Sequence, residues 1–397
     1  MTVPTLLDAP RTRIGALPAP ALAGLFLAGF VGMLTEVLPA GLLPEMGKTL
    51  GVSTALTGQT VSVQALGIAM AAIPLTLATA TWPRRHVLLL ALAIIMVANV
   101  LTAVSTSFTF TLVARLVAGL ANGLIWSLLG GYASRLAPAG RQGKAIAIAL
   151  GGIPASLALG LPLGIVLGKV GGWPFAFYAA AGLTGLIMLW ILFTLPNLEG
   201  KNSCARAKVT DVLVIPGLRP ILFVIATYIV AHNILYTYIT DFLSHAGIGG
   251  QTQWVLLTFG VMAMVSILFV GAHIDRHLRR LAVSCTVVFA VCVLVLAVLS
   301  GIPALVYAAA AAWGLSFGSS ATLFTTAVIN ATGESSDVAQ SIAFTVFPCA
   351  IALGGFLGGL LVAGLGAVVL PWAALILLIA AAAAVIRGKR HTFPQST

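Results

Sequence analysis

The apolar stretch at residues 87–104, VLLLALAIIMVANVLTAV, indicates the class of fold. It carries no charge, and one helix needs about 20 such residues to cross the roughly 30 Å hydrocarbon core of a bilayer. Strands of a transmembrane β-barrel alternate polar and apolar residues, whereas this stretch is continuously apolar and therefore predicts a helix. The sequence thus predicts an all-α membrane protein. Similar stretches along the 397-residue chain predict 12 transmembrane helices, near 21–43, 55–79, 87–104, 108–132, 145–168, 175–195, 219–240, 254–272, 281–299, 304–329, 339–363 and 370–386.

The composition of the whole chain excludes the soluble classes of protein. Hydrophobic residues make up 60% of the chain and charged residues only 7%, against about 25% charged residues in an ordinary soluble domain. A net charge of +11 would suggest nucleic acid as the partner of a soluble protein. Here the basic residues are scattered in short loops between apolar stretches, so we expect no nucleic-acid partner. The cysteines have no spacing typical of a zinc site, so no metal is expected. They are Cys204, Cys285, Cys292 and Cys349.

The basic residues are distributed unevenly between alternate loops. If the N-terminus is cytoplasmic, 17 of the 20 Lys and Arg residues lie in cytoplasmic loops and tails, and the outer loops hold only Lys48 and Lys169. Cytoplasmic loops of membrane proteins carry this kind of excess. We therefore expect a multi-pass protein of the inner or plasma membrane with both termini in the cytoplasm. Residues 1–20 lack the apolar core of a signal peptide and are expected to form a cytoplasmic tail.

The two halves of the chain resemble each other. Gly-Leu-Ala-Asn-Gly at 119–123 and Gly-Leu-Ser-Phe-Gly at 314–318 are offset by 195 residues, and Arg84-Arg85 and Arg279-Arg280 have the same offset. A duplicated six-span unit predicts two pseudo-symmetric six-helix halves with a solute cavity between them, near the midplane of the membrane. The expected domains are a cytoplasmic tail (1–20), an N-terminal six-helix bundle (21–195), a cytoplasmic linker (196–218), a C-terminal six-helix bundle (219–386) and a cytoplasmic tail (387–397).

Three ionisable residues lie at similar expected depths inside spans. Glu36 and His232 each lie eight residues before the outer end of their span, about 12 Å below it, and Arg115 lies about 10 Å below the start of its span. Ionisable residues are costly inside a membrane and commonly functional, so we expect these three to couple protons to transport. In this hypothesis ionised Glu36 pairs with Arg115, and protonation from outside releases Arg115. The alternatives are a static ion pair that locks the helices and, for His232, a neutral imidazole in the core.

Polar residues in the apolar spans are candidates for lining the cavity, although each could instead form hydrogen bonds between helices. These candidates are Gln64, Asn122, Trp126, Asn233 and Tyr236. Asp241, at the outer end of the seventh span, is expected to be a solvated boundary residue. Glycine and proline within a span allow close helix packing or bending. The residues expected to have this packing or hinge role are Gly119, Gly123, Gly160, Pro162 and Gly164.

The loop between the eighth and ninth spans has the pattern Gly271-x-x-x-Asp275-Arg276-x-x-Arg279-Arg280. Asp275 can accept hydrogen bonds from the first amides of the next helix, and the arginines suit the inner membrane interface. An ordinary excess of positive charge explains the arginines, but it does not explain the spaced Gly and Asp. This loop resembles the signature loop of the major facilitator superfamily.

Other motifs resemble the same superfamily. The pattern Arg115-x-x-x-Gly119-x-x-x-Gly123 is similar to the fourth-span motif of its proton-driven exporters, and Gly160-Leu-Pro162-Leu-Gly164 resembles a reduced form of its fifth-span antiporter motif. Residues 35–44 and 232–239 resemble the branch of proton-coupled sugar- and drug-efflux permeases that includes the arabinose efflux permeases. The matching loop of the first half, residues 76–85, keeps only the Arg84-Arg85 pair of the signature.

The resemblance implies a major facilitator fold and proton-coupled export by alternating access. The solute would be a small organic molecule such as a drug, a sugar or a nucleoside-like compound. Glu36 and Arg115 would occupy the coupling positions, and 271–280 would be a gating loop. The proton gradient would supply the energy, so no cofactor is expected, and the partners would be the solute, protons and the bilayer around a monomer. Two alternatives stay open: a proton-coupled uptake symporter, and an integral-membrane enzyme, for which the sequence has no convergent catalytic cluster.

Overall fold

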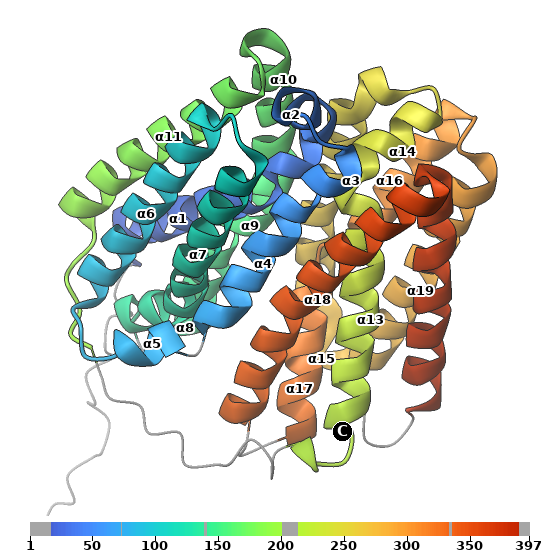
Figure 1. Ribbon diagram of the computed structural model, residues 1–397. Coiled ribbons are helices and arrows are strands. Elements are labelled where there is room, and N and C mark those ends of the chain that lie inside the picture. The colour runs from blue at the N-terminus through green and yellow to red at the C-terminus, as the bar shows by residue number, and fades with distance from the viewer. Residues whose placement is uncertain (1–16, 73, 139–140, 201–212, 333–335, 389–397) are drawn as a thin grey trace, which may run out of the picture.

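The computed structural model of the protein describes residues 17–72, 74–138, 141–200, 213–332 and 336–388. Within these residues the chain is helical and contains no strand. The helices form two bundles that stand side by side, one coloured blue to green and the other yellow-green to red in Figure 1. The all-α fold with two helical halves that the sequence predicts is therefore confirmed. The predicted linker residues 201–212 and most residues of both predicted tails lie outside the described part of the chain.

The first bundle contains α1 (Ala19–Val37), η1 (Leu38–Gly41), α2 (Leu43–Leu50), α3 (Thr54–Thr57), α4 (Gln59–Ala72), α5 (Pro74–Ala78), α6 (Arg84–Val104), α7 (Phe108–Leu136), α8 (Gln142–Leu150), α9 (Gly152–Ala155), η2 (Ser156–Gly160), α10 (Leu161–Gly171) and α11 (Trp173–Thr194). The second bundle contains α13 (Leu218–Thr237), α14 (Ile239–His245), η3 (Gly249–Gln251), α15 (Thr252–Leu299), α16 (Pro303–Phe317), α17 (Ser320–Thr332), α18 (Ser336–Leu365), η5 (Ala367–Val369) and α19 (Leu370–Arg387).

In the described part of the chain, 11 helical stretches are long and apolar enough to cross a membrane. They agree to within five residues with 11 of the predicted spans, so the chain is a multi-pass membrane protein. The remaining predicted span, 55–79, contains α3, α4 and α5, and residue 73, between α4 and α5, lies outside the described part of the chain.

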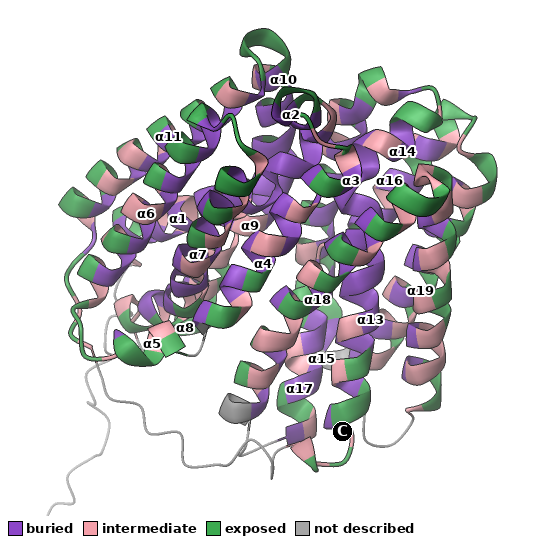
Figure 2. Cartoon of the chain, in the orientation of Figure 1, coloured by how far each residue is buried: buried purple, intermediate pink, exposed green. Residues whose placement is uncertain are grey.

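The outward faces of the helices are exposed and apolar. Figure 2 shows exposed residues along the outer sides of α11, α18 and α19 and buried residues where helices face each other. Phe193 of α11 is 86% exposed and Ile376 of α19 is 69% exposed. An apolar surface of this extent would aggregate in water, whereas lipid chains cover it in a bilayer.

Glycines allow equivalent helices of the two bundles to approach closely. A Cβ atom added to Gly119 of α7 would overlap the carbonyl oxygen of Gln64 in α4. In the second bundle, a Cβ atom added to Gly314 of α16 would overlap the carbonyl oxygen of Phe259 in α15. The two glycines are 195 residues apart, and so are the two residues that they contact. The glycine four residues later in each matched segment makes the same kind of contact. The offset between the halves of the sequence is therefore also an offset between equivalent packing contacts.

The two ends of the molecule differ in how the bundles meet. We call the end that carries α2, α3 and α14 the α14 end, and the end where α11 stops and α13 starts the linker end. In Figure 1, α4 and α18 run close together near α3 and diverge toward the linker end. Hydrogen bonds join the bundles at the α14 end. Oγ1 of Thr240 donates to the carbonyl oxygen of Ala40 at 3.0 Å, and Nζ of Lys169 donates to Oε1 of Gln253 at 2.8 Å.

Tyr238 is the most deeply buried of these connections. Its hydroxyl lies 3.1 Å from the carbonyl oxygen of Ala55 in the first bundle and 3.0 Å from that of Gly355 in the second, and Nε2 of Gln59 donates to it at 3.3 Å. A Cβ atom at Gly58 would overlap the phenol group. The structure thus has a closed α14 end in which one side chain spans both bundles.

Candidate functional site

A cavity of about 160 Å³ lies between the two bundles. Its walls come from α1, η1, α4, α9 and η2 in the first bundle, and from α13, α15, α16, α17 and α18 in the second. Most of the lining is apolar. The polar lining residues are Glu36, His232, Asn233, Tyr236, Thr237 and Ser320. Four of them lie on α13 at positions i, i+1, i+4 and i+5, so they share one face of that helix.

Glu36 belongs to α1 and is 5% exposed. Its Oε2 accepts a hydrogen bond from Nδ2 of Asn122 at 3.2 Å, and the side chain of Trp126 also forms a hydrogen bond with it. Both partners belong to α7 and both are neutral. A carboxyl group at the cavity wall, held by neutral donors and shielded from water, is costly to ionise in a membrane.

Arg115 is fully buried, and five neutral acceptors surround its guanidinium. A guanidinium has five N–H donors, so each donor can have its own partner. The ring of Phe177 lies 5.1 Å from its central carbon atom. The five acceptors are Oγ1 of Thr102, the carbonyl oxygen of Thr35, Oε1 of Gln64, the carbonyl oxygen of Ala98 and Oδ1 of Asn99, at 3.0 to 3.4 Å.

The predicted ion pair between Glu36 and Arg115 is not formed in this conformation, because both side chains have other hydrogen-bond partners. Consecutive residues of an α-helix point about 100° apart. The side chain of Thr35 therefore faces Asn99, which itself accepts from Arg115, while the next residue, Glu36, faces Asn122 and the cavity. Whether Glu36 and Arg115 couple protons to transport stays a prediction.

The five predicted cavity residues fall into two groups. Asn233 and Tyr236 line the cavity. Asn122 and Trp126 instead form hydrogen bonds with Glu36, and Oε1 of Gln64 accepts from Arg115. The sequence identifies all five as polar groups inside spans. Asn122, Trp126 and Gln64, however, hold the ionisable side chains of Glu36 and Arg115 in place.

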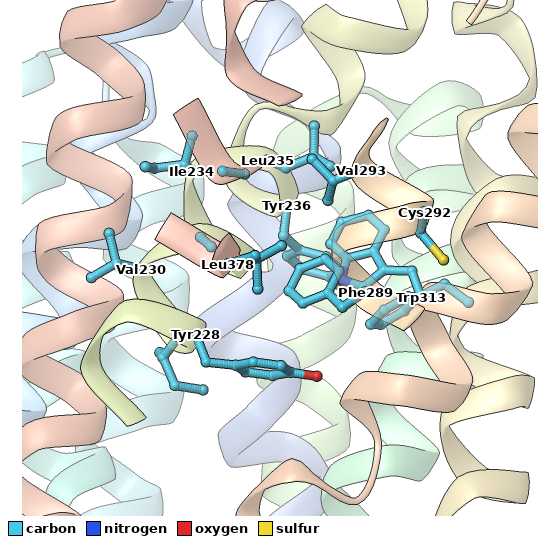
Figure 3. Close-up of a cluster of buried hydrophobic side chains, with 14 of the residues drawn as sticks. Tyr228, Val230, Ile234, Leu235, Tyr236, Phe289, Cys292, Val293, Trp313 and Leu378 are labelled. Atoms are coloured by element: carbon cyan, nitrogen blue, oxygen red, sulfur yellow. The ribbon is translucent and has the colours of Figure 1, made fainter. Parts of the chain in front are cut away.

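His232 lines the cavity and is 4% exposed. Its ring stacks on Phe317 with 3.5 Å between ring centroids and 10° between planes, and Tyr236 lies 4.8 Å away. Figure 3 shows the neighbouring cluster, in which the rings of Tyr236, Phe289 and Trp313 lie close together. Among the residues that the structure describes, Nδ1 of His232 has no hydrogen-bond partner.

Comparison with known proteins identifies the family. Residues 25–252 match the sequence model of the Major Facilitator Superfamily. The chain belongs to this superfamily. It is 28% identical over 330 residues to the purine ribonucleoside efflux pump NepI of Shigella dysenteriae serotype 1. The matched region covers 82% of this chain and 84% of the relative. The NepI proteins of Escherichia coli (strain K12) and of Shigella flexneri are also 28% identical and cover 82% of this chain and 83% of their own length. The superfamily is one of membrane transporters, and membership therefore indicates a transporter rather than an enzyme.

The predicted gating loop of this transporter lies where two helical spans meet. α15 continues from Thr252 to Leu299, and the spans on either side of the loop meet at a kink at His277, whose φ and ψ are −133° and 24°. The tight connection expected between these two spans is therefore a kink in the chain, and its role in gating stays a prediction. Nη2 of Arg279 donates to the carbonyl oxygen of Ile386 at 3.1 Å and so attaches the kink to α19. The side chains of Asp275 and Arg276 lie outside the described part of the chain, and the side chain of Arg280 is exposed.

The fifth-span motif lies where the helix changes its winding. The chain forms a π-helical turn from Ser156 to Gly160, and α10 follows with Pro162 in its first turn. A Cβ atom at Gly164 would overlap the side chain of Leu38 in η1, so glycine there allows the two segments to pack closely. Single π-helical turns inside α-helices are frequent at functional sites.

Two residues near the cavity and the interface were missed or misjudged from the sequence. Thr237 lines the cavity beside Tyr236, and its position four residues after Asn233 could have identified it by helical spacing. Asp241 was expected to be solvated, but it is half-buried, and its Oδ2 is buried without a hydrogen-bond partner in the described structure. Thr54 of the other bundle forms a side-chain hydrogen bond with it. The expectation failed because α14 turns back over the first bundle, which the sequence of this span alone does not reveal.

Proposed function

We propose that this chain is a proton-coupled efflux transporter that exchanges protons for small organic solutes of the nucleoside kind through the cavity between its bundles. The observation that carries the proposal is the position of Glu36. It is the one carboxylate within the 11 spans of the described chain, and it lines the same cavity as the polar face of α13. The 28% identical relatives are named as purine ribonucleoside efflux pumps, which supports export and this class of solute.

Glu36 is suited to bind a proton in alternation with solute. Ionised, it is a charge at the wall of an apolar cavity whose hydrogen-bond partners, Asn122 and Trp126, are neutral. A proton removes that charge without removing these hydrogen bonds, so protonation changes the polarity of the cavity more than its shape. Solute and proton then compete for one cavity, which is the requirement for exchange.

The closed α14 end supports alternating access. Transport through a central cavity requires that the bundles separate at one end at a time. In this conformation Tyr238 and Thr240 hold the α14 end together, so opening that end requires breaking their bonds to Ala55 and Ala40. With the basic linker end in the cytoplasm, in the inner or plasma membrane, the α14 end faces outward and this conformation precedes release of solute.

The test is solute-dependent proton movement in proteoliposomes that contain the purified chain. Under an imposed pH gradient, inosine, adenosine, arabinose and a cationic drug are added in turn, and internal pH and solute uptake are recorded together. We expect protons to move opposite to a nucleoside. Movement in the same direction would establish symport, and the absence of any coupled movement would refute proton coupling.

Glu36→Gln is the matching variant, because glutamine keeps the size and hydrogen-bonding capacity of the side chain but cannot carry the proton. We expect it to bind nucleosides and to exchange them across the membrane without proton movement. Asn122→Asp would serve as a comparison that adds a second acid beside the first. If Glu36→Gln retains full proton-coupled transport, Glu36 does not carry the proton.

A further inference from the structure

Three buried polar atoms on one face of α13 lack partners. Nδ1 of His232, the hydroxyl of Tyr236 and Oγ1 of Thr237 make no hydrogen bond among the described residues. The three side chains are 4%, 3% and 0% exposed, and all three line the central cavity. Buried polar groups are almost always hydrogen-bonded, because leaving one unpaired costs free energy. Three unpaired groups within six residues of one helix therefore indicate that a ligand supplies the missing partners.

The surroundings of His232 favour a neutral imidazole. Phe317 stacks on its ring at 3.5 Å, and Tyr236 and Trp313 follow at 4.8 and 5.3 Å. The titratable groups that line the cavity with it are Glu36, from α1, and Tyr236, from its own helix, and neither is hydrogen-bonded to it. Aromatic rings stabilise a cation far less than water or an ion pair does, so an imidazolium here would lack compensation for its burial. A neutral imidazole instead offers one donor and one acceptor.

The wall around these groups selects for a flat solute. Phe317 and Phe347 contribute aromatic side chains to the lining, and the rest of it is mainly aliphatic. Aromatic rings favour offset stacking or edge contacts with other rings. The only carboxyl group in this wall is Glu36, which the proposed function assigns to the proton, so a charged solute would find no counter-charge of its own.

We propose that His232, Tyr236 and Thr237 form a recognition edge for an uncharged heteroaromatic solute, with hydrogen-bonding groups on the rim of its ring. His232 then determines solute specificity as a neutral donor and acceptor and does not carry the transported proton. This inference rests on the proposed function for its transport readout. It adds that these three residues select the solute, and that Glu36 rather than His232 binds the transported proton.

The experiment compares solute recognition with proton coupling in the full chain. Proteoliposomes with wild type, His232→Gln, Tyr236→Phe or Thr237→Val are assayed for the KM of inosine exchange and for protons moved per inosine. Each variant removes or alters one of the unpartnered groups, so we expect KM to rise about 5- to 20-fold with the proton ratio unchanged. Purine riboside lacks the 6-oxo group of inosine. When it replaces inosine, we expect one of the three variants to have the same KM as wild type.

Tyr228→Phe is the matched control, because Tyr228 is also a buried tyrosine on α13 but its hydroxyl already bonds to the carbonyl oxygen of Ser316 at 2.9 Å. It does not line the cavity. We expect its KM for inosine to equal that of wild type, even if its thermal stability falls. Thermal unfolding of each purified variant in detergent shows which variants are folded. Tyr236→Phe removes only one hydroxyl group, so we expect it to fold and to allow the test even if another variant does not fold.

Two results would overturn the recognition edge. Loss of proton movement in His232→Gln with the inosine KM unchanged would make His232 a proton carrier, and an unchanged KM in all three variants would remove the edge itself. If wild type moves no solute against a proton gradient, the proposed function fails separately. In that case the dissociation constant of inosine, measured by thermal stabilisation of the purified protein, still decides the recognition edge, and the lack of any binding to wild type overturns it.

Discussion

The carbonyl oxygen of Thr35 accepts a hydrogen bond from Nη1 of Arg115 at 3.2 Å, one residue before Glu36. The buried cation and the cavity carboxyl group therefore belong to separate networks that share one turn of α1. A movement of that turn that releases Glu36 from Asn122 also shifts an acceptor of Arg115. The two groups are coupled through the backbone rather than by an ion pair.

Arg115→Lys should destabilise the protein although it keeps the charge. An ammonium group has three donors, so at least two of the five acceptors around Arg115 lose their partner. We expect a loss of at least about 2 kcal/mol in unfolding free energy, measured by thermal unfolding in detergent. Arg219→Lys is the control, because the exposed Arg219 makes one bond within the described residues, to the carbonyl oxygen of Leu213. Equal melting temperatures for both variants would show that the five-acceptor arrangement does not stabilise the fold.

Gly119→Ala and Gly314→Ala should destabilise the two bundles by similar amounts. In each case the added methyl group overlaps a backbone carbonyl that cannot move without displacing a helix. Overpacking of this kind costs about 1–3 kcal/mol or more. Gly130→Ala in the same helix α7 has open space around the added methyl group and should be neutral or slightly stabilising. Thermal unfolding of the three variants checks the prediction, and a stable Gly314→Ala would mean that the two bundles do not pack equivalently.

Tyr238→Phe should open the α14 end more often. The change removes the hydroxyl that connects Ala55 and Gly355. Losing these bonds should shift the balance between closed and open forms by about 1–2 kcal/mol, or about 5- to 30-fold. Spin labels at the exposed residues Lys48 and His245, on opposite bundles, report the separation by pulsed electron resonance. An unchanged distance distribution would exclude Tyr238 as a connection that controls opening.

Closure of the α14 end should depend on pH through Asp241. Burial raises the pKa of its carboxyl group, and the nearby Glu45 carboxylate raises it further, while the hydrogen bond from Thr54 lowers it. When the end opens, water reaches the carboxyl group and its pKa returns toward the ordinary value of about 3.9. The closed form therefore binds the proton more tightly, so acid favours closure. This contribution is lost as the pH rises through the raised pKa.

The same pair of spin labels measures this dependence. We expect the closed fraction of wild type to fall as the pH rises through the raised pKa of Asp241, and Asp241→Asn to stay closed over the same range. Glu45→Gln is the control, because it removes the neighbouring charge and leaves the buried carboxyl group in place. A pH response that persists in Asp241→Asn would assign the effect to another group.

The position of residues along the membrane normal could be predicted from the sequence, but their direction around each helix could not. Glu36, Arg115 and His232 all lie in spans, as expected. The helices are apolar on all sides, so no polar face shows which way a side chain points. For this reason the sequence gives no sign that Glu36 and Arg115 face different neighbours. The kink at His277 was also hidden, because charged residues between two apolar spans are as typical of a loop as of an exposed helical turn.

The glycine motif was more informative, because close helix packing is one of the two roles that its spacing allows. Small residues at 119 and 314 predict close helix contact in both halves, and the structure places each against the carbonyl oxygen of an equivalent residue.

The order of the residues around Arg115 has a consequence for biogenesis. All five of its acceptors belong to residues 35–102, which the ribosome completes before it reaches position 115. An arginine at the centre of an isolated helix costs about 2.5–3.5 kcal/mol to insert through the translocon. Because synthesis proceeds from the N-terminus, α1, α4 and α6 are already made when α7 emerges. The guanidinium can therefore move directly from the translocon into a waiting set of oxygens, and the first bundle can assemble in the order in which it is translated.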